Sequence, residues 1–160
     1  MILYLLVTAL TVFMAYFVNS AYAGKLNSKG QRIVQNRQSL LNKVLLTGIF
    51  TILFALSALR IGIGNDYWVY RDHFLHIMSG DTAVSYEVGF QALVKVLQSL
   101  FGYDNYRIVF AVMAFLTSLF FVKGLFDNAD WFVMSFFLFM ANGFYFMSFS
   151  NVRYYFVMAV

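Results

Sequence analysis

Apolar runs of bilayer length recur along this chain, and they restrict it to a fold built inside a membrane. Hydrophobic residues make up 62% of the sequence and charged residues only 11%. A soluble domain carries about 25% charged residues, so this chain could not cover a water-exposed surface. In hydrocarbon, helices satisfy their own backbone hydrogen bonds. We therefore predict an all-α fold, a polytopic bundle of transmembrane helices.

The predicted spans are the runs that approach the 20 or so apolar residues needed to cross a hydrocarbon core about 30 Å thick. They cover about residues 2–23, 44–59, 108–122 and 131–149, and a fifth begins at about residue 154. Because the fifth run stops after a few residues, we expect residues 1–160 to be a single membrane domain, the N-terminal part of a longer protein.

The first run also carries Ala21-Tyr22-Ala23, which has the small-x-small form of a signal-peptide cleavage site. No basic residue precedes this run, and it is longer than the apolar region of a typical signal peptide. We therefore favour a retained first span over a cleaved leader.

The orientation follows from residues 24–43, a loop that holds five basic residues and no acidic one. By the positive-inside rule this loop is cytoplasmic, which places the N-terminus outside. A lipid-binding polybasic patch is the alternative interpretation of the loop. With this topology residues 60–106 form an outer segment, and Arg60 and Arg153 lie on the same face of the membrane.

The outer segment contains a predicted amphipathic helix over residues 87–101. Four polar residues recur there at helical spacing: Glu87, Gln91, Lys95 and Gln98. The helix is too short to span comfortably, so we expect it to lie at the membrane interface. Its polar stripe either faces solvent or lines an outer cavity.

Arg60 ends the second run, and a turn with two glycines then leads to Asp66 and three aromatic residues. An arginine beside lipid is energetically unfavourable, so it usually has a function. Binding an anionic headgroup is the function that suits its charge. Tyr67, Trp68 and Tyr70 are typical either of an interfacial aromatic belt or of sugar stacking.

Other motifs give weaker evidence for a functional site. Gly62-x-Gly64 lacks a third glycine and follows an apolar helix, which argues against a dinucleotide site. His73-x-x-His76 has metal-ligand spacing but no further firm ligands. We predict no metal and no cofactor. The net charge of +4 arises from the basic loop, so we predict no nucleic-acid partner.

Three motifs together resemble the EpsG family of bacterial inner-membrane proteins, which are Wzy-like exopolysaccharide or O-antigen polymerases. They are Arg60-x-Gly62-x-Gly64-x-Asp66-Tyr67-x-x-Tyr70, Tyr86-Glu87-Val88-Gly89-Phe90 and Ser150-Asn151-Val152-Arg153. The family arginine near the later span is commonly followed by Gln, where this chain has Tyr154.

The resemblance implies a glycosyltransferase of exopolysaccharide or capsule biosynthesis that joins oligosaccharide repeat units linked to polyprenyl diphosphate. The expected substrate-binding residues are Arg60, Arg153, Tyr67 and Tyr70, and Asp66 and Glu87 are the candidate catalytic bases. The expected partners are the bilayer, the lipid-linked substrate and other polysaccharide-synthesis membrane proteins. A transporter or flippase subunit for the same glycans, or a non-catalytic scaffold, is the alternative.

Overall fold

The computed structural model describes residues 2–18, 25–26, 32–33, 36–79, 88–102 and 106–159. Apart from a pair of two-residue antiparallel strands, β1 (Lys25–Leu26) and β2 (Arg32–Ile33), the elements of this part of the chain are helices. They are α1 (Ile2–Tyr16), α2 (Asn36–Ala58), α3 (Tyr67–Ser79), α4 (Val88–Phe101), α5 (Arg107–Asn128), α6 (Phe132–Ala141), α7 (Phe144–Met147) and α8 (Val152–Ala159). The predicted all-α fold is confirmed.

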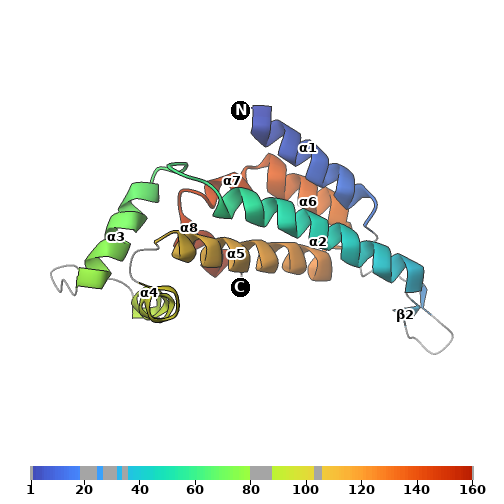
Figure 1. The fold of residues 1–160 in the computed structure, drawn as a ribbon. Coiled ribbons are helices and arrows are strands. Elements are labelled where there is room, and N and C mark those ends of the chain that lie inside the picture. The colour runs from blue at the N-terminus through green and yellow to red at the C-terminus, as the bar shows by residue number, and fades with distance from the viewer. Residues whose placement is uncertain are drawn as a thin grey trace.

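Helices α2 and α5 form the centre of the structure, where they run side by side in opposite directions (Figure 1). Helix α1 packs on α2 and α6, and α8 packs on α5. Helices α3 and α4 lie together at one end of the bundle, where α2 ends and α5 begins. The chain returns to this same end after α6, so residues far apart in sequence meet there.

Two helices are long and apolar enough to cross a membrane among the described residues. They are the Ser39–Ala58 part of α2, with a mean hydropathy of 1.9, and α5, with 2.2. Helices α1, α4 and α6 are apolar but shorter. Together with the composition, these helices mark a membrane protein.

The helix bounds differ from the predicted spans at several points. Helix α2 begins at Asn36, inside the predicted loop 24–43, because residues 36–43 are mostly good helix formers that continue the helix into water. Helix α5 continues to Asn128, and an ion pair of 2.8 Å between Lys123 and Asp127 supports its last turns. The first predicted span ends at residues that lie outside the described part of the chain.

The predicted span 131–149 is not one continuous helix. Helix α6 ends at Ala141, and Gly143 adopts a left-handed conformation with φ of 75°. Its N–H donates to the carbonyl of Met140, which satisfies a helix-end group. Helix α7 and a further turn follow this break, so the chain changes direction before it reaches Arg153.

The outer segment 60–106 contains more helix than the sequence predicted. Helix α3 was not expected, whereas α4 coincides with the predicted helix 87–101 from Val88 onward. Lys95 is exposed on α4, but Gln98 is buried at 6% exposure. The predicted polar stripe therefore divides between solvent and the protein interior, since Gln98 has turned inward.

Two hydrophobic clusters hold the helices together. The first joins α1, α2, α5, α6 and α7, with fully buried side chains such as Ile49, Leu53 and Phe136. The second joins α3, α4, α8 and the first turns of α5 around Tyr67, Val94 and Phe110. Helix α5 contributes to both clusters and so ties α3 and α4 to the rest of the bundle.

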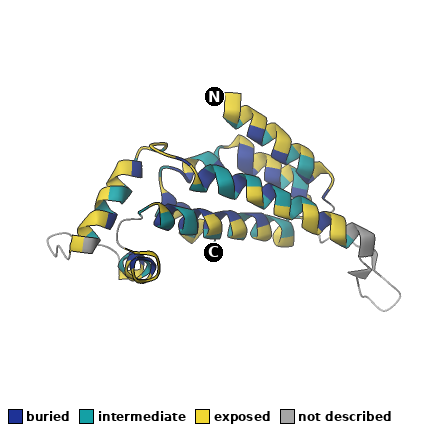
Figure 2. Cartoon of the chain, viewed as in Figure 1, coloured by how far each residue is buried: buried dark blue, intermediate teal, exposed yellow. Residues whose placement is uncertain are grey.

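Exposed residues occur on the helices throughout the bundle (Figure 2), and many of them are large and apolar. Leu59 is 78% exposed, Ile2 75% and Leu5 64%. So many exposed large apolar side chains are unfavourable in water but suit contact with lipid. The exterior therefore agrees with a helix bundle that lies in a membrane.

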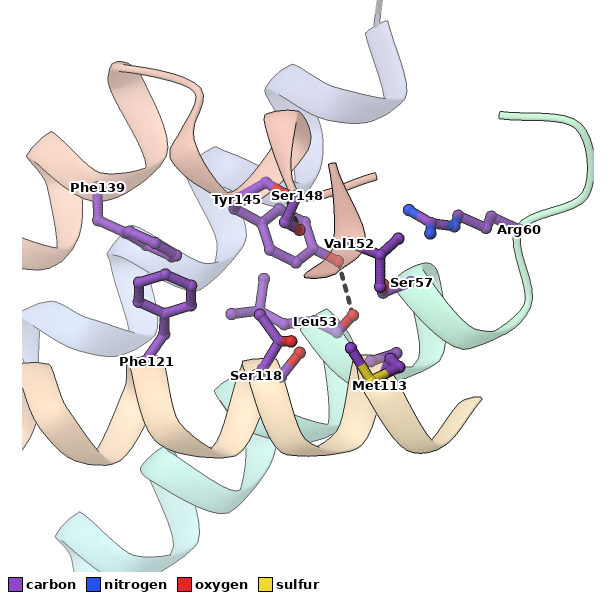
Figure 3. A pocket seen from close by; sticks show the side chains of 12 residues that line it. Leu53, Ser57, Arg60, Met113, Ser118, Phe121, Phe139, Tyr145, Ser148 and Val152 are labelled. Carbon is purple, nitrogen blue, oxygen red and sulfur yellow. Dashed lines mark hydrogen bonds between the residues drawn. The ribbon is translucent and has the colours of Figure 1, made fainter. Parts of the chain in front are cut away.

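The hydroxyl of Tyr145 donates a buried hydrogen bond of 2.6 Å to the carbonyl of Leu53 and so fastens α7 to α2 (Figure 3). We expect Tyr145→Phe to lower the free energy of unfolding by about 1 kcal/mol, the net value of such a bond. Thermal unfolding of the detergent-solubilised protein measures the change. Tyr154→Phe is the matched control because Tyr154 is 62% exposed. Equal unfolding temperatures for the two variants would contradict the role of this bond.

Candidate functional site

Arg60 follows the end of α2 by two residues, yet its side chain is only 6% exposed. The guanidinium carbon lies 4.8 Å from the centre of the Phe149 ring and 5.5 Å from that of Phe110. Such cation–π contacts are stronger when the cation is removed from water. Arg60 is thus held between the start of α5 and the turn after α7.

The charge of Arg60 has no acidic counterpart among the described residues. Its Nε and Nη1 atoms are buried without a hydrogen-bond partner there. Burial lowers the pKa of Arg60 to about 10, and the groups that partly offset this effect are tyrosines. The guanidinium therefore stays positive at neutral pH and lacks acceptors for two of its nitrogen atoms.

A small pocket with a mixed apolar and polar lining lies beside Arg60 inside the bundle (Figure 3). Its volume is about 10 Å³, which is room for about one water molecule. Hydroxyl groups from three helices and the turn after α7 line it: Ser57, Thr117, Ser118, Tyr145 and Ser148. The hydroxyl of Thr117 has no partner among the described residues. The pocket can donate and accept hydrogen bonds, and no acidic side chain lines it.

Arg153 lies in the first turn of α8 and is partly buried. Its Nε donates to the hydroxyl of Tyr70 over 3.5 Å, and its guanidinium carbon lies 5.3 Å from the ring centres of Tyr70 and Phe90. His73 on α3 is also near Arg153. Burial is the main effect that lowers the pKa of His73, and the positive charge of Arg153 lowers it further. Arg153 therefore packs against α3 and α4.

Both arginines contact one group of rings, which we call the aromatic cluster: Tyr67, Tyr70, Phe90 and Phe110. The ring of Tyr70, which contacts Arg153, lies 6.4 Å from the ring of Phe110, which contacts Arg60. The structure thus brings the arginines to the same end of the bundle, as their predicted shared face requires. Each approaches the cluster from a different side.

The three aromatic residues after the glycine turn have different environments. Tyr67 is 1% exposed and stacks on Phe110 with ring centres 4.7 Å apart, so it packs in the second hydrophobic cluster. Tyr70 is partly buried under Arg153. Trp68 is 51% exposed and lies under the guanidinium of Arg71 at 5.5 Å. Of the three, Trp68 presents the most free surface to an interface or a sugar.

The two candidate bases are placed differently. Asp66 directly precedes α3, where its partly buried carboxylate lies at the positive end of the helix dipole. It forms no ion pair with Arg60 in the structure, so the salt bridge that would explain Arg60 as purely structural is not present. Glu87 lies outside the described residues. No group of three or more potential metal ligands occurs in the part of the chain that the structure describes.

Several residues of the site were missed by sequence reasoning. Phe110 and Phe149 cover Arg60, and Thr117 and Ser148 line the pocket beside it. Single aromatic and hydroxyl residues inside apolar runs carry no local signal of their role. Only the packing of α5 against the turn after α7 distinguishes them from their neighbours.

Residues 43–160 match the model of the EpsG family. This segment includes the glycine turn, the aromatic cluster and both arginines. No curated protein and no solved structure matches the chain. The match and the shared motifs agree, and the chain belongs to the EpsG family, whose members are Wzy-like polysaccharide polymerases.

Proposed function

We propose that the protein polymerises oligosaccharide repeat units carried on polyprenyl diphosphate at the outer face of the bacterial inner membrane. The observation that carries this proposal is the buried positive charge of Arg60, which has no carboxylate partner among the described residues. A buried donor without an acceptor costs about 1–3 kcal/mol, and more when it is charged. An anionic ligand that arrives with the substrate would offset this cost.

The diphosphate suits the two arginines chemically. Planar guanidinium groups bind phosphate oxygens through charge-assisted hydrogen bonds. In the proposed reaction the bond between the sugar C1 and the diphosphate oxygen breaks, and a hydroxyl of the acceptor unit forms a new bond to C1. Arg60 and Arg153 stabilise the negative charge that develops on the departing diphosphate. The Phe149 and Phe110 rings cover Arg60, so binding requires these rings to move.

The acceptor hydroxyl loses its proton to a carboxylate in this reaction. Asp66 and Glu87 remain the two candidates. Asp66 lies six residues after Arg60, beyond the glycine turn, and so belongs to the same end of the bundle. Asp66→Asn and Glu87→Gln each remove a carboxylate with little change in shape. The base is the residue whose amide variant abolishes turnover of a bound lipid-linked substrate.

The first test replaces each arginine with lysine in the full-length protein. Lysine keeps the charge but loses the planar fork, so we expect Arg60→Lys and Arg153→Lys each to reduce polymer about 100-fold or more. Polymer is measured by gel analysis of cell-surface glycan at matched protein levels. Arg107→Lys is the control because Arg107 is exposed at the start of α5.

The arginine variants also separate a polymerase from a transporter. A polymerase defect leaves single lipid-linked repeat units on the outer leaflet, whereas a transport defect leaves them on the cytoplasmic leaflet. Near-normal polymer length in both lysine variants would remove the arginines from the substrate site. Repeat units trapped on the cytoplasmic leaflet would instead favour the transporter.

The second test concerns topology, because the proposal needs Arg60 and Arg153 outside the cytoplasm. The chain has no cysteine, so single cysteines can report on each side. We expect Ser28→Cys to react only with membrane-permeant thiol reagents, since the basic loop is retained inside. Ser79→Cys, at the end of α3, should react with impermeant reagents in intact cells as well. Labelling of Ser28→Cys from outside would reverse the orientation and contradict an outer-face reaction.

A further inference from the structure

The glycine turn after Arg60 touches the turn between α7 and α8 at a single tight point. Gly64 has a φ of 105°, a backbone conformation that residues other than glycine rarely adopt. A methyl group on Gly64 would overlap the carbonyl oxygen of Phe149 and would lie 2.8 Å from its carbonyl carbon. Next to it, the N–H of Asn65 donates to the hydroxyl of Ser150 over 3.3 Å. We call this contact the 64–149 clasp.

The clasp joins the two segments that carry the arginines. Phe149 is the residue whose carbonyl meets Gly64 and whose ring covers the guanidinium of Arg60. Helix α8 begins three residues after Phe149, and Arg153 is its second residue. A shift of the clasp therefore changes the position of Arg60 and of the Phe149 ring relative to the start of α8, which carries Arg153.

We propose that Gly64 is a positioning residue, and that the 64–149 clasp sets the distance between the guanidinium groups of Arg60 and Arg153. This inference rests on the proposed function, because that distance matters only if one diphosphate bridges both groups. Any residue larger than glycine at position 64 forces the glycine turn and the Phe149 backbone apart. A misplacement of about 1 Å in such a site can reduce the rate on the order of 100-fold.

The first experiment compares alanine at three glycines in the full-length protein. Gly64→Ala introduces both a positive-φ strain and the collision with Phe149. Gly62→Ala introduces the strain at φ of 65° but leaves its nearest contact, a ring atom of Trp68, at 3.5 Å. Gly89→Ala meets nothing within 4 Å. We expect about 100-fold lower kcat/KM for the lipid-linked repeat unit only in Gly64→Ala. Equal losses in Gly62→Ala and Gly64→Ala would overturn the proposal.

The second experiment tests the clasp by crosslinking. It gives a result even if Gly64→Ala fails to fold. The backbone nitrogen of Asn65 lies 3.3 Å from the hydroxyl oxygen of Ser150, so this pair is the natural choice for a disulfide across the clasp. We expect Asn65→Cys/Ser150→Cys to form a disulfide on mild oxidation and to keep its polymerase activity. The same pair should crosslink less efficiently when combined with Gly64→Ala. Activity that is lost on oxidation and restored by reduction would show that the clasp must open, and would overturn its role in positioning.

The outcomes also separate this inference from the proposed function. If Arg60→Lys and Arg153→Lys leave polymer normal, the diphosphate site is refuted, whatever the crosslinking shows. If the lysine variants lose polymer but Gly64→Ala crosslinks and polymerises like the unaltered chain, the arginines remain in the site and the positioning role of Gly64 is refuted.

Discussion

A positive charge held away from water organises this structure. Removing a guanidinium from solvent is unfavourable unless other groups replace its hydration. Around Arg60 the replacement is incomplete, because two aromatic faces and nearby tyrosines supply it and no carboxylate among the described residues does. A structural salt bridge with a carboxylate would have neutralised the charge of Arg60 permanently. The observed arrangement instead leaves two nitrogen atoms of the guanidinium without an acceptor among the described residues, beneath rings that would have to move to admit one.

Helix α5 explains how a membrane bundle supports such a site. Its later turns belong to the first hydrophobic cluster, whereas its first turns pack against α3 and α4 in the second cluster. Phe110 lies in those first turns, where it stacks on Tyr67 and contacts Arg60. Helices α3 and α4 are therefore anchored to the rest of the bundle. They are fixed to a spanning helix through the same ring that holds the arginine.

The sequence was sufficient to predict the all-α fold, because the apolar runs and the low charge leave a chain like this few alternatives. It also placed α4, from the helical spacing of polar residues, and brought Arg60 and Arg153 to one end, which follows from counting the spans between them. It missed α3, whose apolar and polar residues mix without a clear period, and the break at Gly143, since a lone glycine inside an apolar run is usually tolerated. The cover of Arg60 by Phe149 depends on contacts between distant segments, which a single sequence does not encode locally.

The break at Gly143 also limits the height of the apolar wall that α6 forms. Helix α6 has 10 residues and so rises only about 15 Å before the chain turns. A bilayer beside an apolar wall of this height lowers its mismatch by becoming thinner.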